Sequence, residues 1–379
     1  MRSLYYFLVI IIFTNCGEKK TINKHSSYKG TLNLVETIKL PLDEFSSYEF
    51  FNAQLTDNRL IVLNIVNSSL DFYDLKEEKL SNRIKIQSTG PEGVPRLYSF
   101  IYHNADSIFI LPQFSLNGTI IINEKGEFVD RLRVDKFDSD VGSLVNHISS
   151  NNNPSYIFDN KLYFSIYPLQ TSYFPDGYVF DYTLDLNTGK FNGNNKITKP
   201  DMYNNNTQYA SQVFARKKPN AEKWVYSWHA SDSIFIFWNQ SGVITKKSMV
   251  VNGGLNNSAK QLSDKASDEE SILLRAKSYI YGEIKLQDSI LHRVRFIPLT
   301  DPEEILYSDK VVTLTQDFEI LTYNLNNGEF IGSTKFKGGL YDPRVFLANK
   351  NGLYIPKINP DNPDLSENYI EYDVFSIQH

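Results

Sequence analysis

The feature that most constrains the fold is a short pattern that recurs six times along the chain. Each copy has a turn residue, a small or polar residue, and then a run of β-branched or aromatic residues. Two copies, ADSIFIL (105–111) and SDSIFIF (231–237), are nearly identical. Such repeats predict one β-rich unit used several times, because no unit alone can bury both faces of its strands. The copies lie at 58–63, 106–111, 160–164, 232–237, 288–291 and 351–355.

A second pattern, a hairpin turn, follows most copies of the first. In four of these turns a glycine stands between two stretches with strand character. Glycine supplies the positive φ that tight hairpins need. The aromatic content, with 24 Tyr and 25 Phe, also favours half-buried strands. The four turns are INEKGEF (122–128), DLNTGKF (185–191), NQSGVI (239–244) and NLNNGEF (324–330), and DLKEEKL (74–80) takes the same place without glycine.

Six such units predict an all-β, six-bladed β-propeller over residues 31–379. The alternatives are a pair of β-sandwiches or a solenoid. The last unit is one strand short, whereas TLNLVETIKL (31–40) precedes the first unit and alternates like an outer strand. We therefore expect this N-terminal strand to complete the last blade and close the ring, which leaves no long open edge.

One helix is expected near 267–280, within the interval between the fourth and fifth units. Ser267 and Glu270 have the spacing of a capping box, and an apolar stripe follows. The stripe consists of Ile272, Leu273, Ala276 and Ile280. We expect the helix to cover the fourth and fifth blades at one end, and the alternative is a partner-binding helix.

The N-terminus has the organisation of an export signal. Arg2 precedes a ten-residue apolar run, 4–13, which is too short to span a bilayer. Cys16, the only cysteine of the chain, follows at once and cannot form an internal disulfide. This arrangement resembles a bacterial lipoprotein precursor, although Asn15 replaces the usual small residue. It implies a signal peptide at 1–15, a lipid on Cys16 and a polar tether at 16–30. The alternative is an ordinary signal peptide that is cut nearby.

No motif in the sequence carries a recognisable reaction. The nucleophile elbow, the P-loop, the dinucleotide fingerprint and HExxH are all absent. The six histidines are scattered without metal-ligand spacing, and the acidic run 135–143 lacks the spacing of a calcium loop. The sequence thus predicts no metal and no cofactor. A net charge of −5 gives no basic footprint for nucleic acid.

Ligand-binding candidates come from segments beside the predicted inner strands, where loops open onto a propeller's central channel. Trp228 and His229 could stack on a sugar or an aromatic ligand, and the alternative is packing between blades. Arg293 and Arg295 lie on the same side of a strand and could grip a carboxylate or phosphate, unless they form structural ion pairs. Arg96 and His103 complete the candidates, with a structural bond between blades as the alternative.

The N-terminal segment and the six DSIFIL-like units together resemble a group of uncharacterised bacterial envelope lipoproteins. These carry a six-bladed propeller of the TolB-like or NHL-like kind, and STGPEG (88–93) resembles a turn often found in them. The resemblance implies a lipid-anchored protein of the cell envelope, at the outer rather than the inner membrane. It implies a binding role but no activity.

Three functions follow as hypotheses. The first is a rigid scaffold that binds an envelope protein, a peptide or a glycan. The second is a propeller enzyme with a site at the channel mouth, either a glycan hydrolase or lyase or a sugar dehydrogenase. The third is a structural subunit of an envelope complex. Fold class alone does not choose among them, because propellers serve all three roles.

Overall fold

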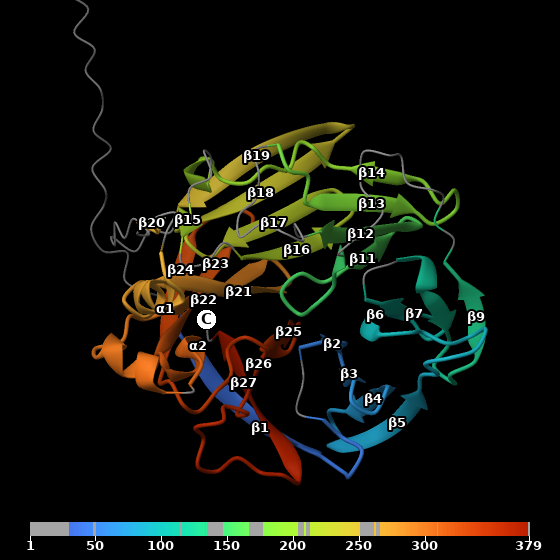
Figure 1. Cartoon of the computed structure of the whole chain (residues 1–379), viewed down its shortest axis with the longest axis horizontal. Coiled ribbons are helices and arrows are strands. Elements are labelled where there is room, and N and C mark those ends of the chain that lie inside the picture. The colour runs from blue at the N-terminus through green and yellow to red at the C-terminus, as the bar shows by residue number, and fades with distance from the viewer. Residues whose placement is uncertain are drawn as a thin grey trace, which may run out of the picture.

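The computed structural model describes residues 30–47, 51–113, 116–132, 134, 147–166, 177–203, 208–209, 213–250, 261–262, 266–308 and 310–377. Six antiparallel sheets stand around a common centre, as Figure 1 shows, and the molecule is a six-bladed β-propeller. The signal peptide and nearly all of the tether lie outside the described residues, as does the acidic run 135–143.

The first three blades follow one another along the chain. Blade 1 consists of β2 (Ala53–Leu55), β3 (Arg59–Asn64), β4 (Ser69–Asp74) and β5 (Lys79–Lys85). Blade 2 consists of β6 (Leu97–Asn104), β7 (Ser107–Pro112), β8 (Ile120–Ile122) and β9 (Phe128–Arg131). In blade 3, β10 (His147–Ile148) and β11 (Tyr156–Phe158) both pair with β12 (Lys161–Ile166), which is followed by β13 (Asp181–Asp185) and β14 (Phe191–Gly193).

The other three blades complete the ring. Blade 4 consists of β16 (Phe214–Asn220), β17 (Lys223–Trp228), β18 (Ser233–Gln240) and β19 (Val243–Val250). Blade 5 consists of β21 (Ile280–Gln287), β22 (Ile290–Phe296), β23 (Phe318–Asn324) and β24 (Phe330–Phe336). Blade 6 consists of β25 (Leu347–Asn349), β26 (Gly352–Pro356), β27 (Tyr369–Ile377) and β1 (Leu32–Pro41). A separate pair joins β15 (Gln208–Tyr209) and β20 (Gln261–Leu262).

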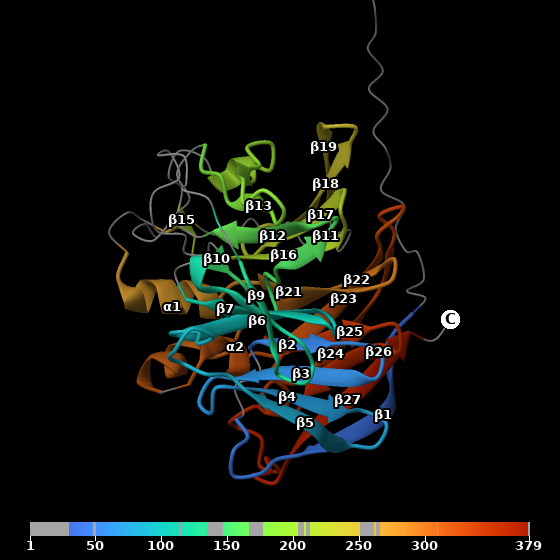
Figure 2. The same ribbon diagram turned by 90° about the vertical axis from the view of Figure 1, so that its right-hand side faces the viewer.

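The ring closes through the N-terminal strand, as the sequence predicted. β1 pairs antiparallel with β27 from Leu32 opposite Ile377 to Pro41 opposite Tyr369. The blue and red strands lie side by side in Figure 2. The first and last parts of the described chain thus share one blade, and the outer edge of β27 is covered.

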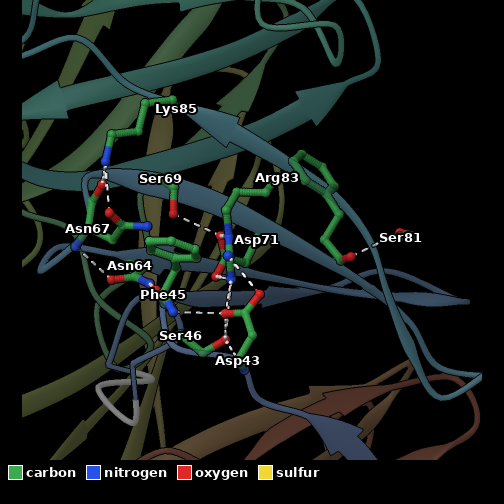
Figure 3. A network of polar contacts seen from close by, with 11 residues as sticks. Asp43, Phe45, Ser46, Asn64, Asn67, Ser69, Asp71, Ser81, Arg83 and Lys85 are labelled. Carbon is green, nitrogen blue, oxygen red and sulfur yellow. Dashed lines mark hydrogen bonds and ion pairs between the residues drawn. The ribbon is translucent and has the colours of Figure 1, made fainter.

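An arginine clamp fastens the segment after β1 to blade 1 (Figure 3). Arg83 on β5 binds Asp71 of β4 at 2.8 and 2.9 Å, and it binds Asp43 of the segment at 2.9 and 3.0 Å. Ser46 also bonds to Asp43 at 2.9 Å. The Arg83 hydrogen bond holds the pKa of the Asp43 carboxyl below its usual value. The clamp therefore connects the sixth blade to the first by charge-assisted bonds in addition to the strand pairing.

The recurring strands are apolar throughout because blades cover them on both sides. Leu60 and Val62 of β3 pack with side chains of blade 6, whereas Ile61 and Leu63 pack with side chains of blade 2. Successive side chains point to opposite faces of a strand, so each strand of this kind contributes side chains to two apolar cores. Six apolar clusters of this type, one between each pair of neighbouring blades, make up most of the interior.

The structure corrects the place of the recurring pattern. Residues 58–63, 106–111, 160–164, 288–291 and 351–355 fall on the second strand of their blades, and not on the innermost one. The fourth copy, 232–237, falls on β18, the third strand of blade 4. The similarity of ADSIFIL and SDSIFIF therefore reflects the shared demands of two buried strands, since the two do not occupy equivalent positions.

The predicted hairpin turns are confirmed. All four glycines have positive φ, from 70° at Gly189 to 85° at Gly242. Each turn joins the third and fourth strands of its blade. In DLKEEKL, where no glycine is present, Glu78 takes the left-handed conformation with φ 49°. The same turn position in blades 1 to 5 explains why this pattern locates those units reliably.

The predicted helix is α1, which spans Asp268–Ala276 and begins with the expected capping box between Ser267 and Glu270. It ends before Ile280, which starts β21 instead. Ala276 packs with Ile305 and Val312, from η4 (Pro302–Tyr307) and α2 (Val312–Thr315). These two short helices lie between β22 and β23 and were not predicted. Two further short helices are η1 (Leu116–Gly118) and η3 (Asp201–Tyr203).

Candidate functional site

A cavity of about 410 Å³ lies on the axis of the ring. Residues from the innermost strand of every blade line it, including Leu55 of β2, His103 of β6, Phe158 of β11, Leu286 of β21 and Ala348 of β25. These residues stand near the carboxyl ends of their strands. The cavity therefore lies toward the face that carries the first hairpin of each blade.

A short segment of blade 3 forms the floor of this cavity. The innermost position of the blade is split between β10 and β11, and 149–155 runs between these two short strands. Asn151 reaches across the axis to blade 1, where its side-chain oxygen accepts from the Ala53 amide at 2.9 Å. Its own amide donates to the Phe51 carbonyl at 3.0 Å. The polar segment 149–155 thus occupies the axis below the cavity, a space that one continuous innermost strand in blade 3 would leave empty.

Two lysines converge on this floor from blades 4 and 5. Lys217 of β16 and Lys285 of β21 both donate to the main-chain oxygen of Asn151, at 2.5 and 2.7 Å. Their exposed fractions are 6% and 5%. Burial lowers the pKa of Lys285 to about 8 and that of Lys217 well below its usual value, to which repulsion by Lys285 contributes. We call these residues the lysine pair.

A third lysine lies on the other side of the same strand. The amine of Lys218 sits 3.4 Å from the centre of the Trp224 ring and 4.1 Å from that of Tyr163. It donates to the Ala221 carbonyl at 2.6 Å. Burial lowers the pKa of Lys218 to about 7, and the nearby Arg216 acts in the same direction. The aromatic faces stabilise the ammonium only in part.

The charge around the cavity is one-sided. Among the described residues that line it there are three lysines and one histidine but no aspartate or glutamate. Glu283 on β21, which is 4% exposed, acts electrostatically on both members of the lysine pair. Burial raises the pKa of Glu283 to about 7, so this carboxyl only partly balances the two amines near neutral pH. Unbalanced buried amines cost stability, and such groups cluster at functional sites.

Of the six predicted binding residues, only His103 lines the cavity. It is exposed and stands near the end of β6. Arg96 is also exposed, but it lies just before β6, in a left-handed turn with φ 52°. Its carbonyl accepts from the Gln113 amide at 2.9 Å. The structure therefore brings His103 to the site and leaves Arg96 away from it.

None of Trp228, His229 and Arg293 lines the cavity; they lie between blades, where Arg293 of blade 5 contacts the main chain that follows β17 of blade 4. Trp228 is 1% exposed and packs in the aromatic core between blades 3 and 4. Arg293 is fully buried and donates to the carbonyls of Asp232, Trp228 and Ser231 at 3.0, 3.2 and 2.6 Å. Burial, with Arg275 and Arg293 nearby, lowers the pKa of His229 to about 3. These placements favour the packing alternative.

Arg295 forms the structural ion pair that was the alternative to ligand binding. It lies opposite Glu319 of β23 in the register, and the two side chains are 2.9 Å apart. Both are nearly buried, with side-chain exposures of 9% and 6%. Burial alone would lower the pKa of Arg295, but the hydrogen bond and the charge of Glu319, together with Tyr281, outweigh it and raise the pKa. This ion pair therefore links β22 to β23 and stabilises the sheet of blade 5.

Sequence reasoning missed the lysine pair and Lys218, although a signal was present. FARKKPN (214–220) puts three consecutive cations into a strand whose neighbours are apolar. Glu283 and Lys285 are two residues apart in IYGEIKLQ (280–287), and therefore share one face of an apolar strand. Charges within a strand that should be buried on both faces would have pointed to the axis.

The part of the chain that the structure describes contains no group of three or more His, Cys, Asp or Glu residues placed to hold a metal ion. Within the same residues, no helix has the length and apolar character that crossing a membrane requires.

Comparisons with known proteins place the fold. Residues 36–290 match the family described as a domain of unknown function, DUF4221. A crystal structure of a member of that family from Bacteroides vulgatus has a TM-score of 0.77 at 18% identity, over 93% of this chain and 99% of that one. A candidate exported protein from Bacteroides fragilis has a TM-score of 0.52 at 11% identity, over 92% and 96% of the two chains. Among curated proteins none matches the chain.

Proposed function

We propose that this chain, which belongs to the DUF4221 family, is an exported, lipid-anchored propeller that binds an anionic ligand in its axial cavity. The ligand would carry a carboxylate or phosphate group, as small organic acids, peptide termini and acidic glycans do. The family is one of unknown function, so the proposal rests on the cavity itself.

The observation that carries the proposal is the set of three lysines around a cavity whose described lining residues include no aspartate or glutamate. Lys217 and Lys285 share the Asn151 carbonyl as an acceptor and hydrogen-bond to each other, which uses only part of the three donors that a lysine ammonium offers. An anion above them would provide the missing acceptors and favour the protonated form of both amines. Binding would thus recover part of the free energy that their burial costs.

The cavity also limits the size and character of the ligand. A volume of about 410 Å³ lies in the range of small-molecule sites, and apolar residues such as Leu55, Phe158 and Leu286 form much of its wall. A ligand with an anionic end and an apolar or ring-shaped body fits this lining. A long peptide or glycan would enter only with its terminal group.

The test is a titration of the soluble Cys16→Ala protein with succinate, inorganic phosphate and, as a neutral control, glucose. We expect the anions to bind with a Kd of about 1 mM or tighter, with uptake of protons, and to weaken as the pH rises through about 8. The double variant Lys217→Met, Lys285→Met should lose at least about tenfold in affinity. Lys161→Met removes an exposed lysine on β12 and serves as the matched control. Glucose binding as tight as that of the anions, or unchanged binding by the double variant, would refute the proposal.

Export and anchoring are supported by the N-terminal sequence and by the similarity to the candidate exported protein from Bacteroides fragilis. The apolar run 4–13 would direct export, and acylated Cys16 would hold the propeller at the outer membrane by a polar tether. Metabolic labelling with a fatty acid should place lipid on the wild-type protein and not on Cys16→Ala, which should leave the membrane fraction. Wild-type protein without lipid would overturn the anchor but not the binding site.

A further inference from the structure

The lysine pair has the arrangement of a reactive amine beside a proton donor. Both amines contact the same oxygen of Asn151, at 2.5 and 2.7 Å, and so lie within about 5 Å of each other. Both line the cavity. An amine close to a second cation and withdrawn from water is the type that reacts with carbonyl compounds near neutral pH.

We propose that Lys217 forms a reversible imine with an aldehyde or ketone ligand that enters the axial cavity. The inference rests on the proposed function in one respect, that the cavity is a ligand site. It adds the chemical class of the ligand, a carbonyl compound, and the atom that it reaches, the Lys217 Nζ.

Three charged groups act on the Lys217 amine. Lys285 and Arg216 lower its pKa in addition to the effect of burial, whereas Glu283 raises it. Lys285 keeps a higher pKa, at about 8, because Glu283 and its hydrogen bond to Lys217 partly offset burial. Of the two amines, Lys285 therefore holds its proton more tightly, and Lys217 is the one that more readily becomes the free amine.

The reaction balances without an external oxidant or reductant. The Lys217 nitrogen lone pair attacks the carbonyl carbon as the π bond of the carbonyl breaks, and one proton of that nitrogen passes to the oxygen to give a neutral carbinolamine. The ammonium of Lys285 then donates a proton to the hydroxyl group, which leaves as water, and a proton of the Lys217 nitrogen returns to Lys285. The products are one C=N bond and one water molecule, and hydrolysis reverses the sequence.

The experiment traps the imine by borohydride reduction and locates it by peptide mass mapping of the folded wild-type protein. The probes are pyridoxal, which has an aldehyde but no phosphate, and pyridoxal 5′-phosphate, which has both. We expect the adduct on Lys217, formed at least about tenfold faster than on the exposed Lys161, since each unit of lower pKa gives about tenfold more free amine. Lys217→Met should remove this adduct while Lys161→Met leaves it.

A second variant separates reactivity from simple access. Lys285→Met removes the neighbouring ammonium, so labelling of Lys217 should slow at neutral pH and recover as the pH rises. Labelling spread over exposed lysines at the rate of the unfolded chain, or an adduct rate that Lys285→Met leaves unchanged, would overturn the inference. Because the adduct itself is mapped in wild-type protein, its position does not depend on the stability of a variant.

Pyridoxine 5′-phosphate, which has the phosphate but no carbonyl group, distinguishes failure of the two proposals. Trapping of pyridoxal without protection by pyridoxine 5′-phosphate would overturn anion binding and support the imine. Protection of Lys217 by pyridoxine 5′-phosphate from general acylating reagents, together with no borohydride-stable aldehyde adduct, would support anion binding and overturn the imine.

Discussion

Replacing Lys218 by Met should stabilise the protein at neutral and lower pH. Lys218 is 1% exposed, and its amine lies against the faces of Trp224 and Tyr163. Methionine keeps the length of the chain and packs well against aromatic rings, but it carries no charge to desolvate. Replacement of buried charges by apolar residues of similar volume is often stabilising.

The magnitude follows from the pKa. Burial lowers the pKa of Lys218 from 10.5 to about 7, which corresponds to a cost of about 5 kcal/mol for holding the charged form in the fold. The attraction to the aromatic faces returns about 2 kcal/mol, and the Ala221 carbonyl loses its donor in the variant. We therefore expect Lys218→Met to raise the free energy of unfolding by about 1–3 kcal/mol at about pH 6.

The sign with pH is specific to a lowered lysine pKa. Between about 7 and 10.5 the unfolded chain binds this proton and the folded chain does not, so wild-type stability rises with pH in that window. The advantage of Lys218→Met should therefore be largest at or below about pH 7 and vanish or reverse by about pH 10.5.

Urea unfolding of wild type and variant across this range measures the difference, and Lys161→Met, at an exposed site, is the control. A difference that does not change with pH would refute the reasoning, as would a variant that is less stable at every pH.

Three further predictions concern closure and the axis. Arg83→Gln leaves the Asp71 carboxylate, at 3% side-chain exposure, without its cationic partner, and should lower the free energy of unfolding by about 2–3 kcal/mol in urea unfolding. A loss under about 0.5 kcal/mol would show that the clamp is unimportant. Truncation before residue 42 exposes the edge of β27 and should abolish a single cooperative thermal transition, and an unchanged transition would contradict ring closure by β1. Glu283 has a raised pKa of about 7, so its contribution to stability is complete below about pH 4.5 and is lost as the pH rises through 7. The free energy of unfolding of Glu283→Gln should therefore rise relative to that of wild type by up to about 3 kcal/mol between about pH 4.5 and 7. Equal pH profiles of stability for the two proteins would show that the buried carboxyl does not cause the pH dependence.

The sequence predicts the ring well because its signals are local. Glycines such as Gly189 and Gly242 adopt the positive φ that a tight hairpin requires, whatever surrounds the turn. Continuous apolar strands follow from burial on both faces, which every blade shares. For the same reason the sequence pattern gave the wrong strand position in blade 4. β18, the third strand of that blade, is as buried as the second strands of the other blades and therefore carries the same pattern. The short interval before the turn at 239–244 was the local sign of the shift.

The site was harder to predict because it is assembled at the axis from distant parts of the chain. Lys217 and Lys285 meet the Asn151 carbonyl from positions 66 and 134 residues away. Candidates that were chosen for their residue type, such as Trp228 and Arg293, lie instead between neighbouring blades, where large side chains fill the space between the sheets. Consecutive cations in a buried strand, as in FARKKPN (214–220), indicate the axis, but they do not say which distant residues they meet there.

The sequence by itself determined six repeating β units, their outer hairpins, the capped helix and the strand that closes the ring. Each depends on the conformation of a few neighbouring residues or on hydrophobic periodicity. Only the tertiary structure decided that the innermost position of blade 3 is split, that 149–155 fills the axis and that two lysines share one oxygen there. The reason is physical: the environment of an axial side chain is set by the five other blades that surround it, and closure of the ring brings them together.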